Sequence, residues 1–153
     1  MKPLNIVILG GTGFVGSRLV PRLHADGHSI TVLSRNREKH RELGVLPRVR
    51  VISADVYNGE VLRRHLAGAD AAINLVGILN ERGSDGSGFR KVHVELTRNL
   101  LAEGLVDVLQ FGLHPALWGS GQRPFDETDR FRLRLIEAEA FDSGVVLLRY
   151  APA

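Results

Sequence analysis

The sequence predicts an α/β fold in which helices cover both faces of a doubly wound parallel sheet. Two observations predict it. Short apolar runs alternate with helix-like segments along the first hundred residues, which is typical of parallel strands joined by right-handed helical crossovers. A glycine-rich loop, Gly10–Gly16, also follows the first apolar run directly. At 153 residues, the chain has the length of a single domain, 1–153.

Four segments have the composition of buried strands, because apolar or β-branched residues fill them and turn residues follow them. These expected strands are Ile6–Leu9, Ser29–Leu33, Val49–Ala54 and Ala71–Val76. Helices are expected at Phe14–Ala25, Asn36–Leu43, Glu60–Leu66 and Phe89–Leu101. Pro21 has no amide hydrogen to donate to Ser17, so we expect a local kink in the first helix.

The last third of the chain, residues 102–153, has a looser pattern than residues 1–101. Val106–Phe111 and Val145–Arg149 are candidates for a fifth and a sixth strand. Leu113–Asp126 contains two prolines and Trp118 and is interpreted as an irregular loop. Thr128–Phe141 is predicted to be a helix, capped by Asp126 or Thr128.

Composition excludes several classes of protein. The chain has no cysteine, which rules out disulfides and thiol nucleophiles. Its net charge of +3 comes from scattered arginines without interleaved aromatic residues, so a nucleic-acid surface is not indicated. His24 and His28 are four residues apart, but Asp26 and Gly27 are expected to end the helix between them, and the other histidines stand apart, so a metal site is not indicated. Apolar runs too short for a membrane span, and an N-terminus without a signal-peptide pattern, predict a cytoplasmic protein.

The glycine loop is the strongest local signal for binding. A strand, a loop with this glycine spacing and a helix form the pyrophosphate cradle of Rossmann dinucleotide-binding domains. One glycine permits the tight turn, another lets backbone approach the ligand, and the last allows close packing of the helix on the strand. The predicted binding residues here are Gly10, Thr12, Gly13, Phe14, Val15 and Gly16. The alternative is a glycine-rich turn that only connects two elements.

The end of the second strand indicates which dinucleotide binds. NAD-binding domains commonly place a carboxylate about 20 residues beyond the glycines to hold the ribose 2′-hydroxyl. This chain has Ser34 and Arg35 there instead, a donor and a cation suited to a 2′-phosphate. We therefore expect NADP, with NAD as the alternative. The competing interpretation is that Arg35 and Arg37 belong to a solvated loop.

Two further strand ends carry candidate cofactor contacts. Asp55, next to Val56, is placed to accept a hydrogen bond from the adenine amino group, although it is equally suited to capping the next turn. Leu75, Val76 and Gly77 end the fourth strand. Gly77 would let backbone pass close to the nicotinamide ribose, and a simple strand-ending turn is the alternative.

These motifs resemble the extended and atypical short-chain dehydrogenase/reductases. The resemblance rests on the glycine loop, Val32–Arg35, Ala54–Val56, Asn74–Gly77 and Phe89–Leu100. Within that superfamily it points to the branch of the nicotinamide-binding accessory subunit of respiratory complex I. The resemblance implies a sheet that binds NAD(P) across the carboxyl ends of its strands. It also implies, for active relatives, a Ser or Thr, a Tyr acting as acid/base, and a Lys four residues after that Tyr.

This chain departs from the catalytic pattern of those relatives. Gly112 stands where the Ser is expected, and alignment on the predicted helix puts Phe131 and Leu135 at the Tyr and Lys positions. No Tyr-x-x-x-Lys occurs, since the lysines are Lys2, Lys39 and Lys91. Relative to the family, we expect a fold truncated at its C-terminus.

The favoured hypothesis is a non-catalytic NAD(P)-binding scaffold, sensor or subunit, whose location allows peripheral association with a membrane complex. An NADP-dependent oxidoreductase or epimerase/dehydratase-like enzyme is one alternative. A ligand-free interaction module is another, with Leu113–Phe125 docking a partner protein or a second copy.

Overall fold

The chain divides into two compact units, Met1–Asn99 and Leu100–Ala153. The computed structural model describes residues 2–78, 86–117, 119 and 130–153. No helix in these ranges is long and apolar enough to span a bilayer.

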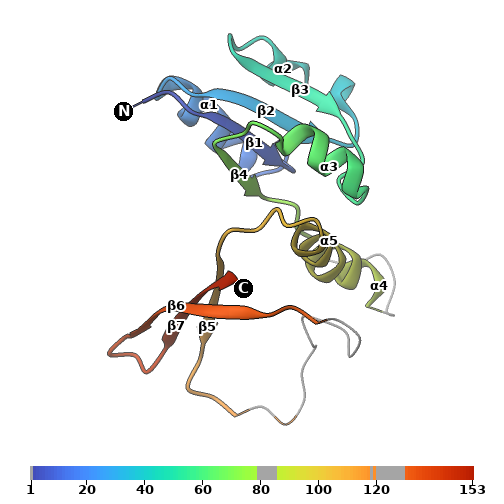
Figure 1. Ribbon diagram of the computed structural model, residues 1–153. Coiled ribbons are helices and arrows are strands. Elements are labelled where there is room, and N and C mark those ends of the chain that lie inside the picture. Colours follow the sequence, from blue (N-terminus) through green and yellow to red (C-terminus); the bar gives the residue numbers. More distant parts are fainter. Residues whose placement is uncertain (1, 79–85, 118, 120–129) are drawn as a thin grey trace. The chain divides into compact units, whose positions relative to one another are not determined.

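The first unit is built on a parallel four-stranded sheet. Its strands β1 (Asn5–Leu9), β2 (Ser29–Ser34), β3 (Val49–Ser53) and β4 (Ala71–Asn74) lie side by side in the order β3-β2-β1-β4 (Figure 1). The chain adds β2 and β3 on one side of β1 and then returns to place β4 on the other side, as in doubly wound folds. The predicted parallel Rossmann sheet is confirmed.

Helices connect these strands. Helix α1 (Gly16–Ala25) follows β1, a 3₁₀ turn (Arg37–His40) and α2 (Arg41–Gly44) follow β2, and α3 (Gly59–Leu66) follows β3. After β4, α4 (Ser87–Phe89), a π-helical turn (Arg90–Glu95) and α5 (Leu96–Ala102) form a continuous helical segment. Right-handed crossovers place α3 on the face of the sheet opposite α1 and α2, because the chain travels back across the sheet from β3 to β4.

Strand β1 is the centre of the hydrophobic core. Ile6 and Ile8 face one side and pack with Ile30, Val32 and Val49 of the neighbouring strands and with Val20 of α1. Val7 and Leu9 are buried on the other side, at 4% and 1% exposed. A strand buried on both faces is wholly apolar, which is why this run is recognisable in the sequence.

The second unit corrects two sequence predictions. Its strands β5 (Leu109–Leu113), β6 (Leu133–Ala140) and β7 (Val146–Pro152) form a separate antiparallel sheet in the order β5-β7-β6. The two candidate strands therefore exist but do not extend the parallel sheet. The helix predicted over Thr128–Phe141 is wrong, because residues 133–140 of that range are the strand β6.

The reason for the missed strand lies in its pairing with β7. Register with β7 puts Leu133, Leu135, Ala138 and Ala140 on one face, and Arg134, Glu137 and Glu139 on the other. A bulge between Leu135 and Glu137 lets the apolar residues on both sides of it face the same side of the sheet. The one-residue insertion hides the alternation from a sequence pattern, and Leu, Glu and Ala are good helix formers. The alignment of Phe131 and Leu135 with catalytic positions depended on that helix and loses its basis.

Close packing at the start of α1 depends on glycine. A methyl group on Gly16 would overlap the backbone of Gly11, with its carbonyl oxygen closest. The first turn of α1 therefore approaches the preceding loop more closely than any other residue would permit.

We predict that Gly16→Ala destabilises the protein, by about 3 kcal/mol at the upper end of overpacking effects, because backbone must move to admit the methyl group. The measurement is the urea midpoint of unfolding followed by circular dichroism. Gly44→Ala is the matched control: a Cβ at that position would have no atom within 4 Å, and the φ of Gly44 is not positive. That variant should be neutral or more stable by up to about 1 kcal/mol. Equal midpoints for both variants would contradict the packing constraint.

Candidate functional site: the carboxyl ends of the parallel strands

The glycine loop lies between the ends of two neighbouring strands. Gly10 adopts a left-handed backbone, with φ +72°, and a Cβ there would lie 2.9 Å from the Val76 amide nitrogen, just beyond β4. The Gly10 amide donates to the Leu33 carbonyl of β2 at 3.2 Å. On the β4 side, the Leu75 amide donates to the Leu9 carbonyl at 2.8 Å. The structure thus brings the loop together with the predicted residues Leu75 and Val76.

The loop presents backbone rather than side chains. The Gly13 amide closes a turn onto the Gly10 carbonyl at 3.0 Å, and α1 then begins without a side-chain cap and without an acidic residue in its first turn. Uncapped amides and the helix dipole make such a terminus favourable for a phosphate group. The predicted residues Phe14 and Val15 are 89% and 57% exposed, so they flank the start of this helix on the surface.

The end of β2 is joined to the loop by a polar contact. The Thr12 and Ser34 hydroxyls lie 3.3 Å apart, and the Asn36 amide donates to the Ser34 hydroxyl at 3.4 Å. Ser34 is buried, whereas the next residue, Arg35, is exposed. The predicted residues Thr12 and Ser34 therefore meet at the carboxyl end of β2, and Arg35 is the next residue along the chain.

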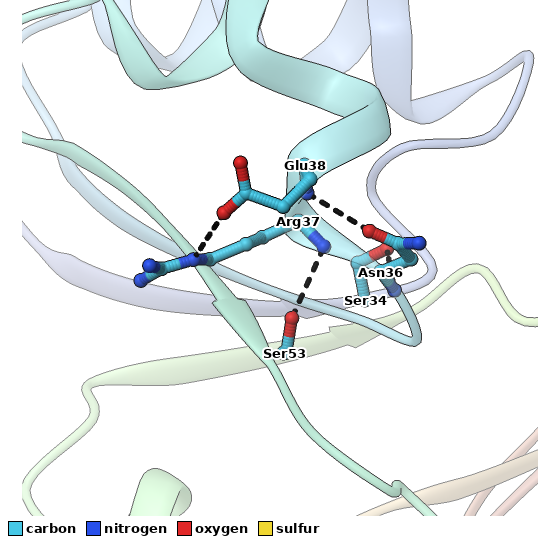
Figure 2. Close-up of polar contacts among 5 residues, drawn as sticks. All are labelled: Ser34, Asn36, Arg37, Glu38 and Ser53. Carbon is cyan, nitrogen blue, oxygen red and sulfur yellow. Dashed lines mark hydrogen bonds and ion pairs between the residues drawn. The ribbon is translucent and has the colours of Figure 1, made fainter.

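The two arginines that follow β2, Arg35 and Arg37, differ in their contacts. The Arg37 guanidinium pairs with Glu38 at 3.0 Å, and its backbone amide donates to the Ser53 hydroxyl of β3 at 3.1 Å (Figure 2). The Asn36 side chain accepts the Glu38 amide at 3.0 Å in the same turn. Arg37 is thus engaged by its own loop, which leaves Arg35 as the better candidate for contact with a ligand.

Asp55 performs the capping role that the sequence left open. Its Oδ1 accepts the Tyr57 amide at 3.0 Å, and Asn58 then caps α3 by accepting the amides of Glu60 and Val61. Val56, the other predicted residue of this turn, is buried at 6% exposed. Contact of Asp55 with adenine stays a prediction.

A cluster around Tyr57 escaped the sequence analysis. Lys91 Nζ lies 4.9 Å from the centroid of the Tyr57 ring, and Asn99 donates to the Tyr57 carbonyl at 3.0 Å. Burial raises the pKa of the Tyr57 phenol above its ordinary value; nearby Arg35 lowers the pKa, and Glu95 and Asp55 raise it. Most of these residues are distant from Tyr57 in the chain, so no local sequence pattern predicts the cluster.

His93 adjoins the residues that follow β4. Its Nε2 lies 3.4 Å from the Ile78 carbonyl oxygen, and its ring stacks on Phe89 with centroids 6.0 Å apart. A Cβ on Gly77 would lie 3.7 Å from His93 Cε1. His93 therefore supports the loop in which the predicted residue Gly77 lies. No group of three or more His, Asp or Glu in the described ranges is arranged to hold a metal ion.

We predict that the Tyr57 phenol ionises above pH 10. In a Tyr150→Phe variant Tyr57 is the single tyrosine, so absorbance at 295 nm reports its ionisation directly. The midpoint should lie above the ordinary value of 10.0 because burial disfavours the phenolate. The folded state holds this proton more tightly than the unfolded state, so the contribution of Tyr57 to stability is lost as pH rises from 10 through the folded pKa. A midpoint at or below 10.0 would contradict the burial of this phenol.

Comparison with known proteins agrees with this architecture. A model of the NAD dependent epimerase/dehydratase family matches residues 6–124. Among curated proteins, an epimerase family protein of Arabidopsis thaliana chloroplasts is 32% identical over 49% of this chain and 21% of its own length. The UDP-glucose 4-epimerase of Neisseria meningitidis is also 32% identical, over 48% of this chain and 24% of its own length.

Solved structures share the fold. An oxidoreductase of Lactococcus lactis, ylbE, superposes with a TM-score of 0.51 and 28% identity, covering 67% of this chain and 44% of that one. The Bordetella bronchiseptica enzyme WbmG, in complex with NAD and UDP, gives a TM-score of 0.57 at 21% identity, over 67% of this chain and 34% of that one. The chain spans only about a fifth to a quarter of the first two curated relatives. Because the family model covers most of its residues, the chain belongs to the NAD dependent epimerase/dehydratase family.

Proposed function

We propose that this chain binds NADP(H), with the pyrophosphate on the Gly10–Gly16 loop. The observation that carries the proposal is the position of that loop between the ends of β2 and β4, next to the reversal of strand order at β1 and β4. Dinucleotides bind at such a switch point in open parallel sheets. The loop suits a pyrophosphate because its glycines expose backbone, and α1 begins without an acidic side chain.

We propose that residues at the strand ends contact the remaining parts of the ligand. Asp55 and Val56 would contact the adenine, with Asp55 Oδ2 as acceptor since Oδ1 already receives the Tyr57 amide. Ser34 and Arg35 would contact the adenosine ribose and its phosphate. Leu75, Val76 and Gly77 would lie against the nicotinamide ribose, in the loop that His93 supports.

Arg35 favours NADP over NAD. The strand end has no carboxylate for a 2′-hydroxyl, and a guanidinium is matched in charge and geometry to a phosphate. Arg37, by contrast, is held by Glu38. The structures of WbmG hold NAD, which supports a dinucleotide ligand of this general class and leaves NAD as the alternative.

We further propose that this chain binds the dinucleotide without transferring hydride. No Tyr-x-x-x-Lys occurs in the sequence. Tyr57 does meet a lysine, Lys91, but the cation lies over its ring, and Tyr57 itself follows β3, on the adenine side of the proposed ligand. A cytoplasmic scaffold, sensor or subunit fits these features, and the motifs resemble the branch of the complex I accessory subunit. A protein partner or a second copy would then receive the signal.

The family itself favours a second candidate, an NADP-dependent oxidoreductase or an epimerase/dehydratase-like enzyme. Both candidate functions use the same cofactor, but only the enzyme would consume NADPH as it converts a substrate. NADPH consumption by the purified chain in the presence of carbonyl substrates, followed at 340 nm, would favour the enzyme. The third hypothesis, a ligand-free module docking through Leu113–Phe125, falls largely on residues outside the described ranges.

Calorimetric titration tests the cofactor proposal. We expect the chain to bind NADPH more tightly than NADH, and Arg35→Ala to weaken NADPH by about 10- to 100-fold while leaving NADH nearly unchanged, since one charge-assisted contact to phosphate is lost. Arg37→Ala removes the same charge two residues away and is the matched control, expected to retain NADPH affinity. Equal losses for both nucleotides in Arg35→Ala would contradict a 2′-phosphate contact, and no binding of either nucleotide by the unmodified chain would contradict the proposed function.

A further inference from the structure

The face of the parallel sheet that carries α3 changes character along its strands. Near the carboxyl ends, register aligns Leu9, Leu33 and Ile52 in an apolar row. Two residues closer to the amino end of each strand, the aligned residues are Val7, Thr31 and Arg50. Since residues in register share a face, a row containing a hydroxyl and a guanidinium lies on the same surface as an apolar core.

This polar half of the face lines a pocket of about 370 Å³. Its lining residues come from the first halves of β1 and β2, from Arg48 and Arg50, and from His65 and the Ala67–Ala69 turn after α3. All of these residues belong to the first compact unit. The volume lies within the range of pockets that hold small molecules.

The charge of the pocket is positive. Arg48 and Arg50 line it, and no Asp or Glu is among its lining residues in the described part of the chain. The carboxylate that follows the lining turn, Asp70, already accepts the Asn5 amide at 2.7 Å. The pocket is therefore lined by two arginines, and none of its described lining residues carries a carboxylate to neutralise them.

Arg48 is held in an unusual conformation at the edge of this pocket. With φ +62° it is the one non-glycine residue of the described ranges with a left-handed backbone. Its Nη1 donates to the Gly27 carbonyl at 3.1 Å, and its own carbonyl accepts the Ile30 amide at 2.8 Å. Strained residues of this kind persist where surrounding contacts enforce them, and they gather at ligand sites.

We propose that this pocket binds a small molecule carrying a phosphate group, at a site separate from the glycine loop. Two guanidinium forks supply planar donors for phosphate oxygens, and Ser29 and Thr31, which carry hydroxyls, also line the pocket. The pocket lies toward the amino ends of β1 to β3, and the lining residue of β1 nearest the loop, Val7, is three residues, about 10 Å, from Gly10. The proposal does not depend on the dinucleotide site.

The test is an amide chemical-shift titration of the full chain with inorganic phosphate, in the presence of saturating NADPH so that a phosphate site on the glycine loop is competed. We expect saturable shifts at Thr31, Arg50 and the Ala67–Ala69 turn, weakened at least tenfold by Arg50→Gln and several-fold by His65→Gln. Arg64→Gln removes the same charge from the residue before His65, outside the pocket lining, and should leave the titration unchanged.

Three results would overturn the proposal. They are the absence of saturable shifts around the pocket, shifts confined to the glycine loop, and equal weakening by Arg64→Gln and Arg50→Gln. The last would assign the effect to overall charge. Failure of NADPH to bind, with the pocket shifts retained, would contradict the dinucleotide proposal and leave the phosphate site standing.

Discussion

The close approach of backbone to backbone around β1 is the constraint on which the rest of this structure depends. At one end of the glycine loop Gly10 lies against the backbone that follows β4, and at the other Gly16 lies against Gly11. A side chain at either position would separate α1 from the sheet or the loop from β4. The approach is possible because β1 is central and buried on both faces, so its end is fixed by neighbours on both sides. Functional geometry at this edge is therefore a consequence of packing.

The parallel sheet and the glycine loop were predictable because their signals are local. Ile6–Leu9 is apolar throughout as a doubly buried strand must be, and Gly10 to Gly16 follow it without a break. Each confirmed strand of the parallel sheet lies in a short run of residues whose own composition predicts a strand. Asp55 shows the same distinction between local and distant signals. Its hydrogen bond from the Tyr57 amide joins residues two positions apart and was predictable, whereas a contact with a ligand leaves no local sequence pattern and is untested.

The features that escaped prediction depend on residues distant in the chain. Strand β6 has good helix formers and a bulge at its centre, and only pairing with β7 makes it a strand. The Arg149 guanidinium there reaches Glu137 at 2.6 Å and Gln110 at 3.1 Å, which links all three strands on the polar face. The meeting of Tyr57 with Lys91 and Asn99 also joins separate elements. Tertiary pairing of this kind overrides local propensity.

The two ends of the parallel sheet carry different chemistry. At the carboxyl ends, exposed backbone, the uncapped start of α1 and one exposed arginine face the proposed dinucleotide. At the amino ends of the same strands, Arg48 and Arg50 are among the residues that line a small pocket. Both ends suit anions, the first through amides fixed by glycine packing and the second through the guanidinium groups of Arg48, just before β3, and Arg50, within it.

Hydrogen–deuterium exchange of the full chain, with and without saturating NADPH, tests the central claim most directly. If the glycine loop holds the pyrophosphate, the amides of residues 10–17 should exchange more slowly with the nucleotide present, with smaller effects at residues 34–36 and 75–78. Unchanged exchange across residues 10–17, or protection confined to residues 100–153, would contradict the account.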